Sequence, residues 1–370
     1  MEQTREITAV QTAAILISTI IGVGVLNLPL IAVQAADTGA PLLTLIAVFL
    51  GFIGLYIMTK LGMRFPDQSI IGYSQIVLGK WIGRMYGIMI ILFFTFLTAM
   101  ASREFGEVVV AAVLKNTPIE VTVIVMLLMA AIFTRDDINT FAYIHNFYVP
   151  AILVPALIIV VLSFTNANTL YFQPIFQPLI ANNLKQVFIG TLTVTALFQG
   201  SFIITIIIPY MQKTGKAMKS AIWGIGISGI LYVMIIFATL SVFGVDEMKN
   251  LMWPTLELAR ATSLPGNILQ RLDVVFLAIW VTAVFTTIFS SYMLTIHSLS
   301  QFFRMQGQKT LSLFLLPIVF FIAMIPHNMF QMYDVIKIVG RLGLLLTIVI
   351  PIFIFIMAII RKLPKSKGGT

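Results

Sequence analysis

The chain has 370 residues, of which 59% are hydrophobic and 10% are charged, and its mean hydropathy is +1.02. A soluble globular chain usually has about a quarter of its residues charged. No polar stretch approaches the size of a soluble catalytic domain. The composition therefore predicts an all-α polytopic membrane protein in which residues 1–370 form a single membrane domain.

Several classes of site are excluded by residue type alone. The chain has no cysteine, which rules out disulfides, thiolate metal sites and a cysteine nucleophile. The three histidines are scattered and fall outside any metal-ligand spacing. No nucleophile–histidine–acid set and no phosphate-binding loop with its lysine is present. We therefore expect no enzyme activity, no metal site and no resident cofactor.

Ten apolar stretches are candidates for membrane-crossing helices, each of which needs roughly 20 apolar residues. In chain order they are 8–35, 41–61, 84–112, 118–134, 141–164, 187–210, 218–243, 272–302, 311–326 and 334–361. We divide them into two five-helix repeats, 8–164 and 187–361.

The loop charges predict how these helices are oriented. With the N-terminus on the cytoplasmic side, fifteen Lys and Arg residues fall on the inside and seven on the outside. This excess matches the positive-inside rule, so both termini are predicted to face the cytoplasm. The net charge of +9 then largely reflects the cytoplasmic loops and tail, whose basic residues contact anionic lipid of the membrane. We therefore expect no nucleic-acid partner.

The first and sixth predicted helices contain residues that helices disfavour. The first includes STIIGVGVLNLP (18–29), and the sixth, in the opposite direction, includes ALFQGSFIITIIIPY (196–210). In a helix interior Gly costs about 1 kcal/mol and Pro about 3 kcal/mol relative to Ala. Gly22 and Gly200 lie at matching depths, which predicts a 5+5 inverted-repeat transporter fold with helices 1 and 6 broken. Close helix packing through small residues is the alternative explanation.

A broken helix frees backbone groups that hydrocarbon cannot satisfy. The N-terminus of a half-helix carries partial positive charge and can hold a carboxylate, and the C-terminus of the other carries partial negative charge and can hold an ammonium. A zwitterion can therefore bind without a charged side chain. Leu97, Thr286 and Thr287 lie at the same depth in the third and eighth predicted helices. The hydroxyls either face a ligand or bond the preceding turn of their own helix. A sodium site using them is also consistent with the pattern, whereas a proton coupler is not obvious.

Charged residues near the predicted outer face form two further candidates. Arg103 and Glu107 are four residues apart and share a helix face, so we interpret them as an outer-edge structural or gating pair rather than a proton relay. Arg271 and Asp273 open the eighth predicted helix, either as a clamp on the outer loops or as a simple interfacial flank. In the preceding loop, PTLELARA (254–261) predicts a short helix.

Four segments in this order resemble one protein family. They are IIGVGVLNLP in the first predicted helix, LGKWIG before the third, MWPTLELAR in the outer loop and FTTIF in the eighth. They are similar to the B subunits of GerA-type nutrient germinant receptors of endospore-forming bacteria. More broadly, the chain resembles the amino acid–polyamine–organocation superfamily, which has the leucine-transporter-like fold.

This resemblance implies a function, partners and site residues. A family member would sit in the spore inner membrane with an A subunit and a lipoprotein C subunit, and would bind a nutrient to trigger germination. The ligand-binding residues would be Gly22, Val23, Gly24, Leu97, Phe198, Gln199, Gly200, Thr286 and Thr287. We therefore expect a sensor of a small neutral nutrient, often an amino acid. An amino-acid permease coupled to Na⁺ or H⁺ is the alternative, and a scaffold with an empty pocket is a third possibility.

Overall fold

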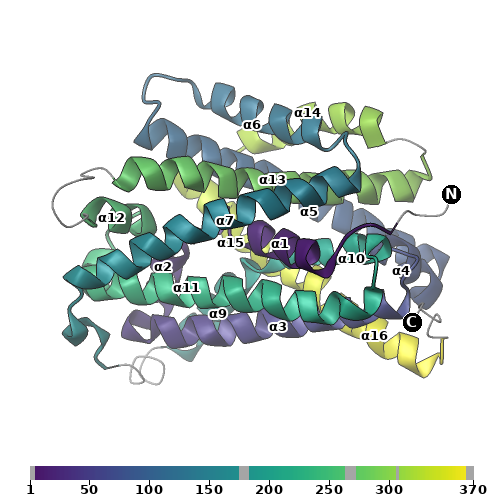
Figure 1. Cartoon of the computed structure of the whole chain (residues 1–370), viewed down its shortest axis with the longest axis horizontal. Coiled ribbons are helices and arrows are strands. Elements are labelled where there is room, and N and C mark those ends of the chain that lie inside the picture. The colour runs from purple at the N-terminus through teal and green to yellow at the C-terminus, as the bar shows by residue number, and fades with distance from the viewer. Residues whose placement is uncertain (1–4, 175–182, 263–271, 306–307, 364–370) are drawn as a thin grey trace.

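The computed structural model describes residues 5–174, 183–262, 272–305 and 308–363. Within these residues the chain is helical, and its β structure is one isolated bridge between Ile7 and Met211. The helices run side by side along an elongated bundle (Figure 1).

The long helices extend over most of the length of the bundle. They are α3 (Ala40–Arg64), α5 (Lys80–Ala112), α7 (Ile138–Ser163), α11 (Ala217–Met248), α13 (Leu272–Phe303), and α15 (Met329–Leu344), which continues through a π-helical turn into α16 (Ile350–Ile360). Shorter apolar helices pack among them: α1 (Ala9–Ile20), α2 (Leu28–Ala36), α6 (Ile119–Phe133), α9 (Leu184–Ala196), α10 (Ile204–Ile207) and α14 (Gln308–Met324). Two more lie in connections: α4 (Ile70–Leu78) and α12 (Pro254–Ala261). The short helix predicted at 254–261 is thus confirmed.

Six helical segments of the described chain are long and apolar enough to cross a membrane. A seventh results if α9 and the helical turns at Gln199–Tyr210 count as one span. By contrast, α1, α6 and α14 have only 12, 15 and 17 residues. Ten membrane spans therefore stay a prediction.

The outer faces of the bundle carry large apolar side chains. Trp81, Phe147, Phe314 and Phe321 each expose more than two thirds of their surface. Many threonines and serines are instead buried inside and bond a carbonyl one turn back in their own helix, as Thr44 does with Ala40. Apolar outside with satisfied hydroxyls inside is the distribution that hydrocarbon favours.

The core is built around the short helix α1. It begins after Thr8, whose side chain accepts the N–H of Gln11 while the Gln11 side chain accepts the N–H of Thr8. This capping box satisfies two free N–H groups at the start of the helix. From there α1 runs into the bundle and packs against α7, α11 and α13 (Figure 1).

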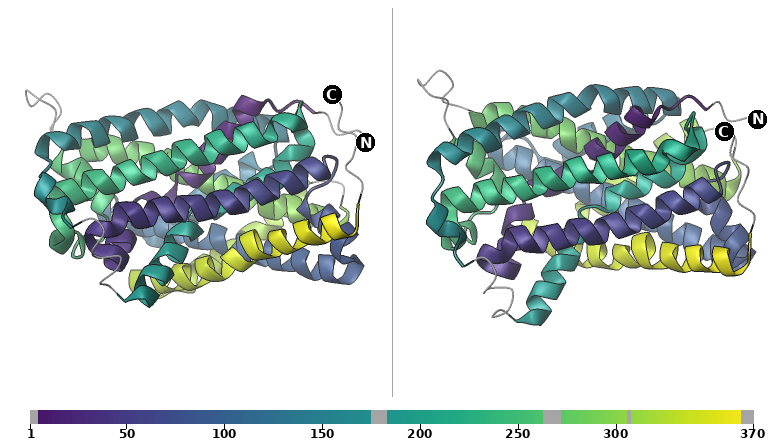
Figure 2. Two further views of the ribbon diagram at one scale, coloured as in Figure 1. Left: turned by 90° about the horizontal axis from the view of Figure 1, so that it is seen from below. Right: turned by 60° about the horizontal axis from the view of Figure 1, so that its bottom comes forward.

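Both ends of the described chain lie at the same end of the bundle, and α12 lies at the other end (Figures 1 and 2). At the first of these ends, the N–H of Ile7 donates to Tyr210 O and the N–H of Gln212 donates to Ile7 O, both at 3.0 Å. The segment that leads into α1 is thus paired with the segment that follows the sixth predicted helix. One helix leaves this end and the other arrives there, so they run in opposite directions.

Close packing of α4 against α5 yields a stability prediction. A Cβ added at Gly83 would lie 2.5 Å from the Cα atom of Gln75, a contact with backbone that no side-chain rotation relieves. We expect Gly83→Ala to lower the unfolding temperature of the detergent-solubilised protein, since overpacking costs about 1–3 kcal/mol.

The matched control is Gly226→Ala on α11, where nothing lies within 4 Å of an added Cβ. We expect this variant to unfold at the same temperature or slightly higher, because Ala is favoured over Gly in a helix by up to about 1 kcal/mol. Equal unfolding temperatures for both variants would contradict the close contact of α4 with α5.

Candidate functional site

The helix that begins with α1 is interrupted between Ile20 and Leu28. The backbone leaves helical geometry at Gly22 (φ −151°, ψ −125°), makes a 3₁₀ turn over Val23–Val25, and resumes as α2 at Leu28. Pro29 lies in the first turn of α2, where a missing N–H costs no intrahelical hydrogen bond. The proline predicted to help interrupt this helix therefore starts its second half.

The sixth predicted helix is interrupted slightly earlier than its glycine suggests. Its first half, α9, ends at Ala196, and helical turns resume at Gln199 with the axis bent by 42°. The bend falls at Leu197 and Phe198, just before Gly200.

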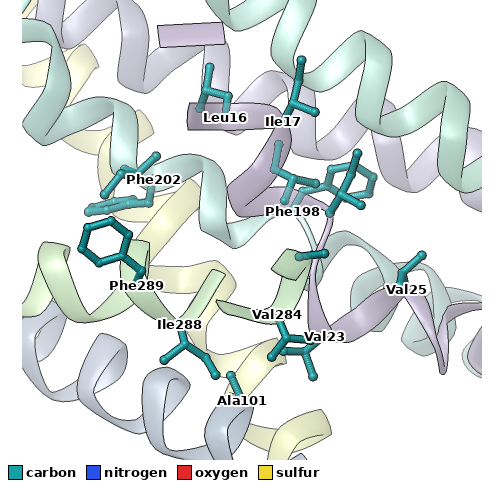
Figure 3. Packing of buried hydrophobic residues seen from close by; sticks show 14 of the residues in the cluster. Leu16, Ile17, Val23, Val25, Ala101, Phe198, Phe202, Val284, Ile288 and Phe289 are labelled. Carbon is teal, nitrogen blue, oxygen red and sulfur yellow. The ribbon is translucent and has the colours of Figure 1, made fainter. Parts of the chain in front are cut away.

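The two interruptions touch each other through their glycines. A Cβ added at Gly200 would lie 3.0 Å from the carbonyl oxygen of Thr19, and one at Gly24 would lie 2.8 Å from Cδ2 of Leu197. Figure 3 shows buried side chains of both segments converging with those of α13, among them Val23, Phe198 and Val284. The chain thus brings together two stretches that lie about half its length apart in sequence.

The carbonyls at the end of α1 accept hydrogen bonds from hydroxyls of other helices. On α13, Thr286 Oγ1 donates to Ser18 O at 2.9 Å and Thr287 Oγ1 donates to Thr19 O at 3.0 Å. On α11, the Tyr232 hydroxyl donates to Ile20 O at 2.6 Å. Protein hydroxyls therefore supply donors that hydrocarbon cannot. Thr286 Oγ1 also bonds Ala283 O of its own helix at 2.8 Å, which is one of the two arrangements expected for these hydroxyls. The bonds of both threonines to carbonyls of α1 were not foreseen.

A buried histidine links the same region to α7. His145 Nδ1 lies 2.6 Å from Ser18 Oγ, and His145 Nε2 lies 3.2 Å from Ser290 Oγ. Ser290 Oγ also lies 2.6 Å from Thr19 Oγ1. This side-chain network joins α1, α7 and α13 beside the interruption. No local motif predicts it, because its members come from three distant segments.

A cavity of about 120 Å³ lies beside the two interruptions. An apolar cavity of roughly 150 Å³ is known to hold benzene, so this space suits a small molecule. The lining includes six of the nine predicted ligand-binding residues: Val23, Gly24, Leu97, Gln199, Gly200 and Thr287.

The other three predicted residues lie just outside the lining. Gly22 backs onto α13, where an added Cβ would lie 1.8 Å from Thr287 Oγ1. The hydroxyl of Thr286 points to the carbonyls described above. Phe198 packs against Tyr232, with ring centroids 5.4 Å apart. These residues position the lining instead of forming it.

The lining also contains polar residues that the sequence analysis did not identify. Glu104, 5% exposed, accepts a hydrogen bond from the Tyr333 hydroxyl at 3.1 Å through Oε1. Trp253 Nε1 donates to that hydroxyl at 2.9 Å. Asn27, Lys337 and the hydroxyl residues Thr19 and Thr193 also line the cavity. The sequence pattern identified Arg103 and Glu107, which share one face of α5. Glu104 points about 100° away from Arg103 around the helix axis and therefore lies on another face.

The predicted outer pairs have the following contacts. Arg103 Nη2 and Glu107 Oε1 form a largely buried salt bridge of 2.8 Å. Asp273 Oδ2 lies 3.9 Å from Arg260 Nε, which connects α12 to the start of α13. Arg271 lies outside the described residues.

The helix α12 covers the end of the first interruption. Thr255 Oγ1 in its first turn donates to Val25 O at 2.7 Å, and the preceding Trp253 bonds Tyr333 as described. The connection between α11 and α13 is therefore attached to both the interruption and the cavity wall.

Comparison with known proteins identifies the relatives of this chain. A family model described as spore germination protein matches residues 6–332. Spore germination protein B2 of Bacillus subtilis (strain 168) is 28% identical over 364 residues, which cover 96% of each chain. Spore germination protein YndE of the same organism is 25% identical, over 97% of this chain and 98% of its own. Spore germination protein GerLB of Bacillus cereus is 22% identical, over 95% and 93%.

A solved structure shows the fold. The crystal structure of MhsT in complex with L-phenylalanine matches with a TM-score of 0.70 at 12% identity, over 97% of this chain and 90% of that chain. The chain therefore has the transporter-like, leucine-transporter type of fold predicted from its sequence. The apolar helices and the match to the spore germination protein family show that the chain is a multi-pass membrane protein.

Replacing Thr287 by Val tests the contact between α13 and α1. Val keeps the shape of the side chain but removes the donor to Thr19 O, and a buried carbonyl left unpaired costs about 1–3 kcal/mol. We expect the detergent-solubilised variant to unfold at a lower temperature than the unmodified protein. The control is Thr282→Val, which loses only a bond to Ile279 O of its own helix. A smaller decrease for Thr287→Val than for Thr282→Val would refute the bridging role of the hydroxyl.

Proposed function

Since the chain belongs to the family of spore germination proteins, we propose that it is the nutrient-sensing B-type subunit of a germinant receptor. The nutrient, a small neutral amino acid, binds in the cavity beside the two interruptions and triggers germination. The observation that carries this proposal is the position of that cavity, where residues from both interruptions and from α5, α13 and α15 form one wall. The amino acid in the complex of the fold neighbour supports the choice of ligand class.

The finer assignments belong to the same proposal. The chain sits in the spore inner membrane with both termini on the core side, as a 5+5 arrangement of ten spans with helices 1 and 6 broken. It works with an A and a C subunit. The ligand residues are those of the lining, supported by Gly22, Phe198 and Thr286. The Arg103–Glu107 pair and the Arg260–Asp273 contact stabilise the outer edge.

Filling the cavity tests nutrient sensing. A methyl group added at Gly24 would displace Leu197, which also lines the cavity. Overpacking of about 1–3 kcal/mol corresponds to a roughly 5- to 150-fold rise in the nutrient concentration that gives half-maximal germination. The measurement is germination of spores that carry Gly24→Ala, with the chain quantified in the spore membrane. Gly226→Ala, far from any neighbour, is the control and should respond normally. A normal response of Gly24→Ala spores to every nutrient would refute the site.

Transport provides the test of the alternative, an ion-coupled amino-acid permease, which the transporter-like fold favours. We expect vesicles containing the purified chain to show no concentrative uptake of labelled L-alanine or L-valine under a Na⁺ or H⁺ gradient. Concentrative uptake that Gly24→Ala abolishes would favour the permease instead.

A further inference from the structure

We propose that Glu104 binds the ammonium group of the ligand, so that the ligands of this cavity are aliphatic primary amines that also carry a carboxylate. This inference rests on the proposed function and specifies the ligand class and its orientation. It depends on four features of the cavity: an unpaired buried carboxylate, the way that carboxylate is held, the occupied carbonyls of α1, and the rest of the lining.

The first feature is the isolation of the Glu104 carboxylate. It is buried on α5 and makes no salt bridge within the described residues. Its neighbour Arg103 is already paired with Glu107. Burying a carboxylate without a cationic partner is costly. A cationic ligand would supply the partner that no salt bridge of the described residues supplies.

The second feature is the fixed orientation of this carboxylate. Because the Tyr333 hydroxyl accepts the N–H of Trp253, its own proton is available for Glu104 Oε1. The tyrosine thus satisfies one acceptor site of the carboxylate and leaves others for the cavity. Asn27, also in the lining, has a buried Oδ1 without a hydrogen-bond partner. Two side chains therefore offer acceptors where an ammonium has three donors to place.

The third feature makes the end of α1 a less favourable site for the ammonium than the broken helix first suggested. The carbonyls of Ser18, Thr19 and Ile20 at the end of α1 already accept hydrogen bonds from Thr286, Thr287 and Tyr232. An ammonium there would compete with donors that the protein itself provides. At Glu104 the protein supplies one donor, the Tyr333 hydroxyl, and the carboxylate keeps further acceptor sites for the ammonium.

The rest of the lining defines the remainder of the ligand. Within the described residues the lining has one basic side chain, Lys337, which complements a carboxylate. Between the charged residues, the wall is largely aliphatic, with Leu97, Met100 and Leu197 among its members. The carboxylate of Glu104, the ammonium of Lys337 and the aliphatic wall of the cavity complement an aliphatic amino acid more closely than a sugar or a nucleoside.

The experiment compares amines with isosteric alcohols. Spores carrying the unmodified chain are exposed to L-alanine, L-valine and L-leucine and to the corresponding 2-hydroxy acids, in which a hydroxyl replaces the ammonium. We expect germination with at least one amino acid and a roughly ten- to hundredfold weaker response to its hydroxy acid, the range for one charge-assisted hydrogen bond. A response to the hydroxy acids equal to that to the amino acids, or no response to any amino acid, overturns the proposal.

Variants assign the preference to Glu104. In Glu104→Gln, which can still accept the Tyr333 hydroxyl, we expect the preference for the amino acid over the hydroxy acid to disappear. Tyr333→Phe keeps the carboxylate and should retain the preference, even if both ligands act more weakly. Glu120→Gln, exposed on α6, is the control and should behave as the unmodified chain. An unchanged preference in Glu104→Gln overturns the proposal.

The controls separate this inference from the proposed function. If Gly24→Ala weakens germination while Glu104→Gln keeps the preference, the cavity senses nutrients but Glu104 does not bind the ammonium. If Gly24→Ala has no effect with any ligand, the proposed function itself fails. Should Glu104→Gln be missing from the spore membrane, Glu104→Asp keeps the charge and is expected to retain the preference. Loss of the preference in an assembled Glu104→Asp chain would count against the proposal.

Discussion

A backbone carbonyl inside an apolar bundle must accept a hydrogen bond from somewhere, and the interruption after α1 frees three of them in succession. Two threonines of α13 and a tyrosine of α11 meet this requirement. Their bonds determine how α13 and α11 lie against α1. They also explain the need for Gly22, because Thr287 reaches its carbonyl only where no Cβ occupies the position 1.8 Å from its hydroxyl oxygen. These carbonyls are satisfied without a ligand, and the cavity lies beside them.

The side chains that hold the interrupted helix and the charged side chains of the cavity come from different helices. Hydroxyls and His145 hold the interrupted helix from the α7 and α13 side, and the charged residues of the cavity come from α5 and α15. The connection between α11 and α13 contacts the interrupted helix through Thr255 and the cavity wall through Trp253. A ligand bound between Glu104 and Lys337 would therefore touch the wall to which α12 is attached.

Local chemistry made part of this structure predictable. Glycines lie at or next to both interruptions, whereas Pro29 starts α2 and Pro209 lies in the helical turn after the bend. A depth count along two other helices selected Leu97 and Thr287, which line the cavity. The same count could not place the bend of the sixth helix, which falls before Gly200, the residue that approaches Thr19 of α1. Glu104 and His145 escaped prediction because their partners lie on distant helices. A single polar residue in an apolar helix carries no sign of what it faces.

The main-chain pairing of Ile7 with residues 210–212 also bears on how the molecule communicates. It fastens the segment ahead of α1 to the end of the sixth helix by two backbone hydrogen bonds. Cargo leaving the cavity between these segments would have to break both bonds. A ligand that only shifts the sixth helix would instead carry the amino-terminal segment along with it. Occupancy of a cavity deep in the bundle would thereby change the molecule's surface at the end where both ends of the described chain lie.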